Sequence, residues 1–234
     1  MTSRIAAPRR WSHVATAAFV GSMAAVVALH VLRPDLDPVR RRLSEYAVGR
    51  FGGLMTAAFV LLGLGLYALS RGVRAAGATT PATRVLRVLL SIAAIGMIVS
   101  GVFETRPVTP PGWREIVHSR ASALAFVALI TAAVWTATVA REVVAWGATR
   151  GVADAVAAIA TLGAVIGPLA HDGPWAGMVQ RMSYVAVLCW LLLAAAATAR
   201  TRPPRGDRAA RLTRVAGDRR AGRRAGRGRD SSWR

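Results

Sequence analysis

Six long apolar segments constrain the fold of this chain more than any other feature of its sequence. A bilayer core about 30 Å thick needs roughly 20 mostly apolar residues per helix. Within lipid a backbone amide has to find its hydrogen-bond partner in its own segment, so these segments are expected to be helices. They cover residues 12–32, 51–69, 85–103, 121–140, 152–170 and 182–199. The sequence therefore predicts an all-α polytopic membrane protein, a bundle of six transmembrane helices.

The charge of the chain is concentrated outside these segments. The 234 residues are 54% hydrophobic and yet carry a formal net charge of +20, with Arg as the only basic residue besides His. Residues 200–234 hold 13 Arg and 3 acids, too polar a composition to bury a core. We therefore expect three parts: a cytoplasmic leader at 1–11, a transmembrane domain at 12–199 and a disordered Arg-rich tail at 200–234.

The same charges predict orientation and partners. The leader contains Arg4, Arg9 and Arg10 and no acid, which favours a cytoplasmic N-terminus, and six helices return the tail to that side. The expected location is the cell membrane, with both termini cytoplasmic. The tail is then predicted to contact the anionic lipids of the inner leaflet. It lacks the interleaved aromatic residues that stack on bases, so no sequence-specific nucleic-acid binding is expected.

Titratable side chains gather at the predicted outer face. Its histidines and acids are His30, His118, His171, Asp35, Asp37, Glu45, Glu104, Glu115 and Asp172. Three interpretations are open. These residues lie near the headgroups because membrane proteins tolerate them there, or His118 acts as a base oriented by Glu104 or Glu45, or the three histidines bind a metal ion. No ligand-spaced motif such as H-E-x-x-H supports a metal, so no metal ligand is assigned, and the lone Cys189 excludes a cysteine cluster.

The first outer connection is unusually structured for a link. Pro34 and Pro38 restrict its backbone, and residues 40–46 are able to form a short surface helix. Such a helix would cover a cavity between the membrane helices, or it would simply anchor their outer ends at the interface. The sequence leaves both possibilities open.

Several short stretches resemble a known family. They are Pro34-Asp35-Leu36-Asp37-Pro38, Leu43-Ser44-Glu45-Tyr46, Phe103-Glu104-Thr105, His118, and Trp175-Ala176-Gly177-Met178-Val179-Gln180-Arg181. In order and position they are similar to landmarks of a bacterial six-helix membrane family, domain of unknown function 998, across roughly residues 12–200. Arg106 departs from this pattern, because an Asp often stands there. The resemblance implies a six-helix bundle and no established activity, and it favours Ser44, Glu45, Glu104, His118 and Arg181 as one outer cluster.

These observations predict a protein that binds a lipid or a membrane partner through the polar cluster at the outer mouth of the bundle. One alternative is a membrane-embedded enzyme acting on a lipid or isoprenoid-like substrate, and another is a small transporter, disfavoured because no internal repeat is present. The candidate catalytic residues are His118, Glu104 and Glu45. The candidate binding residues are Ser44, Tyr46, Arg106, His171, Asp172 and Arg181. The sequence predicts neither a cofactor nor an oligomeric state.

Overall fold

The computed structural model describes residues 3–77, 80–103, 111–169 and 173–201, and the regular secondary structure of this part of the chain is all helical. Its long helices are α1 (Ser3–Leu32), α2 (Gly52–Ala75), α3 (Pro81–Val102), α4 (Trp113–Glu142), α5 (Arg150–Leu169) and α6 (Ala176–Arg200). Two short 3₁₀ helices, η1 (Leu43–Ala47) and η2 (Val144–Thr149), lie in the connections. The predicted six-helix, all-α fold is confirmed.

Five of the helices are long and apolar enough to cross a membrane. They are α1 from Ala7 onward, α2, α3, α4 and α6. The predicted multi-pass membrane protein is therefore confirmed at this level. The helices extend beyond the apolar segments because their polar ends continue the same backbone hydrogen bonding. At the start of α3, for example, the Thr80 side chain caps the helix by accepting a hydrogen bond from the backbone N–H of Thr83.

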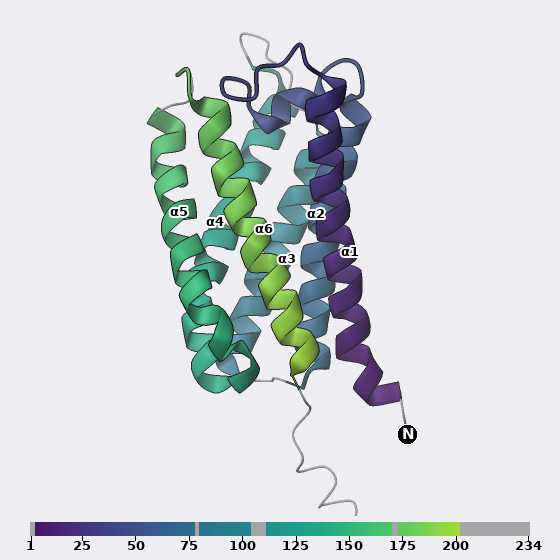
Figure 1. Cartoon of the computed structure of the whole chain (residues 1–234), viewed down its shortest axis with the longest axis vertical. Coiled ribbons are helices and arrows are strands. Elements are labelled where there is room, and N and C mark those ends of the chain that lie inside the picture. The colour runs from purple at the N-terminus through teal and green to yellow at the C-terminus, as the bar shows by residue number, and fades with distance from the viewer. Residues whose placement is uncertain (1–2, 78–79, 104–110, 170–172, 202–234) are drawn as a thin grey trace, which may run out of the picture. The chain divides into compact units, whose positions relative to one another are not determined.

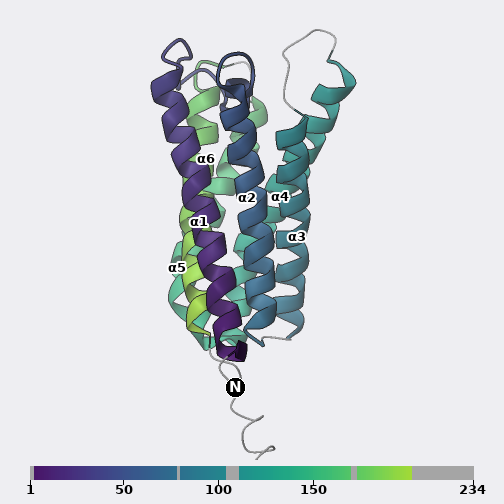
Figure 2. The ribbon, with the colours of Figure 1, turned by 90° about the vertical axis from the view of Figure 1, so that its right-hand side faces the viewer.

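The six helices run alternately up and down, so that each packs against the next along the chain (Figure 1). The sixth helix closes the arrangement, because α6 contacts both α1 and α5. The connection between α1 and α2, which contains η1, lies at the end of the bundle away from the N-terminus (Figure 2). We call this end the η1 end and the other the opposite end.

Small residues bring neighbouring helices into close contact. A Cβ atom added at Gly96 of α3 would lie 2.8 Å from both the Ala121 carbonyl oxygen and the Ala125 Cβ of α4. Gly96 and Ser100, four residues apart on α3, both contact α4, as in other membrane helices, where small side chains allow close backbone approach. The mid-helix Trp190 is fully buried and donates to the Thr136 hydroxyl, 3.2 Å away.

Residues Met1–Thr201 form one unit of the chain and Arg202–Arg234 a second. The second unit lies outside the described residues, and so does the disorder predicted for the tail.

Candidate functional site

Arg33 fixes the two ends of the connection at residues 33–51. Its guanidinium donates to the Asp35 carboxylate at 2.8 Å and to the carbonyl oxygens of Val48 and Arg50 at 2.9 and 3.1 Å. The hydrogen bond from Arg33 holds the pKa of the Asp35 carboxyl below its usual range. The connection is thus an ordered element and not a loose link.

Glu45 organises the start of η1. Burial alone would raise the pKa of its carboxyl, but hydrogen bonds outweigh that effect and hold the pKa below its usual range. The carboxylate accepts from the backbone N–H of Arg42 at 3.1 Å, from Arg42 Nε at 3.2 Å and from Arg41 Nη1 at 3.2 Å. The ionised carboxylate therefore stabilises the start of η1 through these hydrogen bonds.

The first turns of α6 attach directly to this connection. The Met178 N–H donates to the Val39 carbonyl at 3.0 Å, and the Leu43 N–H donates to Gln180 Oε1 at 2.6 Å. Gly177 permits the approach, because a Cβ atom there would collide with the Arg41 carbonyl oxygen and lie 2.6 Å from that of Pro38. The stretch 175–181, prominent in the sequence, is thus the docking point of the connection.

Arg181 joins α6 to α1 and η1. Its Nε–H donates to His30 Nε2 at 2.8 Å, and its Nη1 donates to the Arg41 carbonyl at 2.6 Å. His30 Nδ1 lies 2.7 Å from the Val26 carbonyl oxygen, an acceptor, so His30 is neutral with its proton on Nδ1. The guanidinium also lies over the Tyr46 ring at 5.4 Å. Both nitrogens of His30 are therefore occupied by structural contacts.

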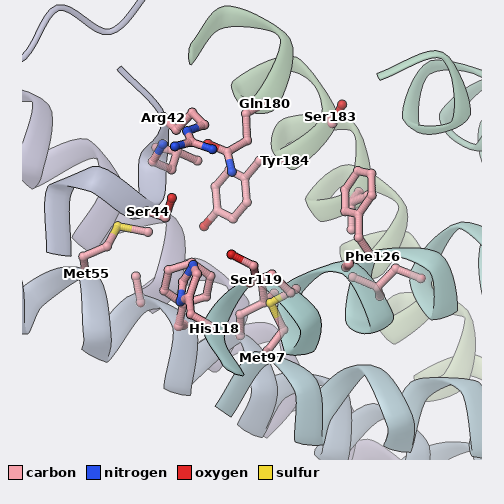
Figure 3. A pocket seen from close by; sticks show the side chains of 18 of the residues that line it. Arg42, Ser44, Met55, Met97, His118, Ser119, Phe126, Gln180, Ser183 and Tyr184 are labelled. Carbon is pink, nitrogen blue, oxygen red and sulfur yellow. The ribbon is translucent and has the colours of Figure 1, made fainter. Parts of the chain in front are cut away.

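A cavity of about 760 Å³ opens beside this junction, within the half of the bundle at the η1 end. Its apolar walls come from several helices and include Met55, Phe59, Leu62, Met97, Phe126, Leu129 and Val187. Its polar lining includes Ser22, Arg42, Ser44, Glu115, His118, Ser119, Ser122, Gln180 and Tyr184. In Figure 3 the Tyr184 ring extends from α6 toward Ser44, His118 and Ser119. The helix predicted at residues 40–46 is the shorter η1 (Leu43–Ala47), and its residues Leu43 and Ser44 line the cavity, which agrees with the first of the two possibilities.

His118 is held in the cavity wall by the end of α3. Its Nδ1 lies 2.9 Å from the carbonyl oxygens of both Ser100 and Phe103. Because carbonyls only accept, Nδ1 carries the proton, and a neutral ring then presents Nε2 as an acceptor. His118 is buried, its ring stands edge-on to Phe59 at 5.9 Å, and Nε2 has no hydrogen-bond partner among the residues that the structure describes.

Two further groups of polar contacts lie in the walls of the cavity. The Ser22 hydroxyl donates to the Ala58 carbonyl at 2.8 Å, so the Tyr184 hydroxyl, 3.0 Å away, is the donor to Ser22 and keeps its own lone pairs available. On the facing wall Ser122 donates to the Ser100 hydroxyl at 2.9 Å. Hydroxyl oxygens able to accept a hydrogen bond thus lie on both walls.

The predicted outer cluster divides into two groups. Ser44 and His118 line the cavity, whereas Tyr46 and Arg181 form the adjoining junction with His30. Glu45 does not orient His118, as the sequence suggested it might; backbone carbonyls do so, because the last turn of a helix leaves carbonyls unpaired. The remaining candidates, Glu104, Arg106, His171 and Asp172, lie outside the described residues.

Sequence reasoning missed Ser22, Gln180 and Tyr184. Gln180 lay within a stretch already singled out, and Tyr184 follows it by four residues on the same helix face. Ser22 gave a weak signal, as a hydroxyl in the middle of an apolar segment. No group of three or more His, Cys, Asp and Glu within the described ranges is placed to hold a metal ion.

A family model, protein of unknown function (DUF998), matches residues 16–197. The chain belongs to the DUF998 family. The match covers almost the whole helical unit, and it confirms the resemblance carried by the motifs in the connection and at the start of α6. Comparisons with curated proteins and with solved structures find no match. In this DUF998 protein the described stretches at residues 34–38, 43–46 and 175–181, together with His118, lie at the cavity or at the junction beside it.

Proposed function

We propose that this DUF998 protein binds a membrane lipid in the cavity at the η1 end. The observation that carries the proposal is the combination of a cavity of about 760 Å³, mostly apolar walls and a cluster of polar groups beneath η1. This volume is within the range of ligand sites that enclose most of a small molecule, roughly 300–1,000 Å³. The apolar walls suit an acyl or isoprenoid chain, which can pass from the bilayer into the cavity and remain in apolar surroundings.

The hydrogen-bonding groups of the cavity indicate which polar headgroup the bound lipid would carry. The side-chain nitrogen of Gln180 is a donor near η1, and it suits a carbonyl or phosphate oxygen. His118 Nε2 and the Tyr184 hydroxyl oxygen are acceptors deeper in the wall, and they suit a hydroxyl group. A lipid whose polar end carries both acceptor oxygens and a hydroxyl satisfies both sets.

A matched pair of substitutions on α4 tests the lipid site. Val127 lines the cavity and Leu124 does not, yet their exposed fractions are almost equal at 59% and 57%. Val127→Trp fills the cavity and is expected to lose bound lipid, measured by native mass spectrometry of protein released from mild detergent. Leu124→Trp is expected to retain lipid like the wild type. Equal lipid retention by the two variants would contradict the proposal.

An enzyme acting on the bound lipid is the second candidate. It is favoured by one observation: His118 is fixed through Nδ1 while Nε2 has no partner among the described residues. A neutral imidazole held in this way can take a proton from a bound hydroxyl or water. The test reconstitutes the protein in liposomes of host lipids and measures lipid masses. If the protein is an enzyme, the wild type should change the mass of some lipid, whereas a His118→Ala variant should bind the lipid and leave it unchanged. Unaltered lipids with the wild type would exclude catalysis on those lipids.

The proposal includes an orientation in the cell membrane, with the η1 end outside and both termini cytoplasmic. Arginines at the η1 end are paired with acids, in the contacts Arg33–Asp35, Arg40–Asp37, Arg41–Glu45 and Arg42–Glu45. At the opposite end α2 and α3 carry Arg71, Arg74, Arg84 and Arg87 close to their connection, and basic residues near the ends of membrane helices favour the cytoplasmic side. The Arg-rich segment after α6 would then contact the anionic inner leaflet.

Two exposed glycines test this orientation. A side chain added at Gly112 or at Gly147 meets nothing within 4 Å, and these residues lie at the η1 end and the opposite end respectively. In a Cys189→Ser background we expect an impermeant maleimide to label Gly112→Cys in intact cells. Gly147→Cys should react only after the membrane is opened. The reverse pattern would refute the orientation and leave the lipid site untouched.

A further inference from the structure

Four arginines meet where α2 ends and α3 begins, far from the cavity. Arg71 and Arg74 belong to the last turns of α2, and Arg84 and Arg87 to the first turns of α3. The electrostatic neighbours of Arg87 are Arg74, Arg71 and Arg84. These like charges repel one another, and the positive end of the α3 dipole adds to the same potential.

The protein supplies no described counter-charge to this group. All described ion pairs lie in the connection at the η1 end, so none of the four guanidiniums has a described carboxylate within 4.0 Å. Arg87 Nε is moreover buried and without a hydrogen-bond partner among the described residues. An arginine that merely extends to water would have its guanidinium hydrated, whereas a buried, unpaired N–H is costly unless a ligand accepts from it.

Aromatic contacts place this group at headgroup depth. The Arg71 guanidinium lies 5.5 Å from the Trp11 ring and 5.9 Å from the Tyr67 ring, and its Nη1 donates to the Tyr67 hydroxyl at 3.3 Å. Trp and Tyr concentrate at membrane interfaces, where their rings lie among the headgroups. The arginines therefore lie at the depth at which lipid phosphates are found.

We propose that Arg71, Arg74, Arg84 and Arg87 form a phosphate-binding site between the ends of α2 and α3. The phosphate group belongs to an anionic phospholipid of the adjacent leaflet or to free phosphate. Guanidinium groups suit it because their paired N–H donors match phosphate oxygens. The site is separate from the η1 cavity and does not depend on the lipid proposed there.

The test compares two double variants of the full chain in a nonionic detergent. Arg74→Gln with Arg87→Gln removes two members of the site. Arg141→Gln with Arg150→Gln removes two exposed arginines from the ends of α4 and α5, close to the same boundary, and serves as the control. Native mass spectrometry measures retained phosphatidylglycerol against phosphatidylcholine, and a parallel thermal-unfolding assay measures stabilisation by inorganic phosphate.

We expect the site variant to retain at least about tenfold less phosphatidylglycerol than the wild type, since each lost charged hydrogen bond weakens binding by about tenfold or more. The control should stay within about twofold, on the scale of scatter for exposed charges. Phosphate-dependent stabilisation without lipid retention would support the site with free phosphate as its ligand. Equal retention and equal stabilisation in both variants would overturn it.

A second measurement separates binding from folding. Because the four charges repel one another when no anion is present, the site variant is expected to unfold at a temperature equal to or above that of the wild type in lipid-free nonionic detergent. Added phosphatidylglycerol should raise the wild-type midpoint more than that of the variant. The proposal would be contradicted if the site variant unfolded at a lower temperature than the wild type without lipid and its midpoint rose as much as that of the wild type when phosphatidylglycerol was added.

Discussion

Gly177 offers the sharpest test of how the connection at the η1 end is held on α6. A Cβ atom at this position would lie 2.6 Å from the Pro38 carbonyl oxygen, whereas ordinary contacts begin at 3.4 Å. Gly177→Ala therefore forces the connection or the helix to move by at least about 0.8 Å, the difference between these distances, because the Arg41 carbonyl oxygen lies closer still. Overpacking of this kind costs about 1–3 kcal/mol.

The connection could instead detach from α6, and the expected cost is then similar. Detachment breaks the hydrogen bonds from Met178 N–H to Val39 and from Leu43 N–H to Gln180. At about 0.5–1.5 kcal/mol each, their loss amounts to about 1–3 kcal/mol. Both routes therefore predict the same loss in the free energy of unfolding.

Gly53→Ala is the matched control. Gly53 is the second residue of α2 as Gly177 is of α6, and a Cβ atom there meets nothing within 4 Å. Both substitutions gain the same intrinsic helix preference of Ala over Gly, about 0.5–1 kcal/mol. Unfolding by denaturing detergent in mixed micelles, followed by circular dichroism, should therefore place Gly177→Ala about 1–3 kcal/mol below Gly53→Ala. Equal stabilities would refute this account of the connection.

Two further predictions concern the junction and η1. Because the folded pKa of Glu45 is lowered, the stability it contributes should be complete above its unfolded pKa of about 4.3 and should disappear as the pH falls through the lower folded pKa. The advantage of the wild type over Glu45→Gln in unfolding midpoint should decline as the pH falls below about 4.3, and Glu142→Gln, at an exposed residue, serves as the control. An advantage that is as large well below that pH as at pH 7 would contradict this. ¹⁵N NMR of labelled histidines should find His30 neutral with its proton on Nδ1, and Arg181→Gln should allow the other tautomer; a charged His30 at pH 7 in the wild type would be inconsistent with the Arg181 contact.

The fold was predictable because it depends on a property that the sequence displays directly. Long apolar segments separated by polar connections permit few structures in a bilayer, and helices satisfy the backbone of each segment locally. The short helix near residues 40–46 was also predictable, since Pro34 and Pro38 restrict the chain before it. What the sequence did not reveal was how tightly this element docks on α6.

The cavity was only partly predictable, because its membership depends on how each helix is rotated about its axis. Ser22 and Tyr184 meet across the bundle although 162 residues separate them. Glu115, His118 and Ser122 follow one another at intervals of three and four residues, so they share a helix face, and all three line the cavity. Glu45 bonds to Arg41 and Arg42 instead of His118, and Glu104, the other predicted partner, lies outside the described residues; the backbone carbonyls that hold Nδ1 had not been considered. A His at the start of one helix can hydrogen-bond to the free carbonyls that end the preceding one.

The central claim, that a lipid occupies the cavity at the η1 end, is tested most directly by an experimental structure of the full chain in lipid nanodiscs. We predict elongated density between Met55, Met97 and Phe126, with its polar end beside Gln180 and His118. A cavity closed by its own side chains, or filled only by isolated waters, would contradict the claim.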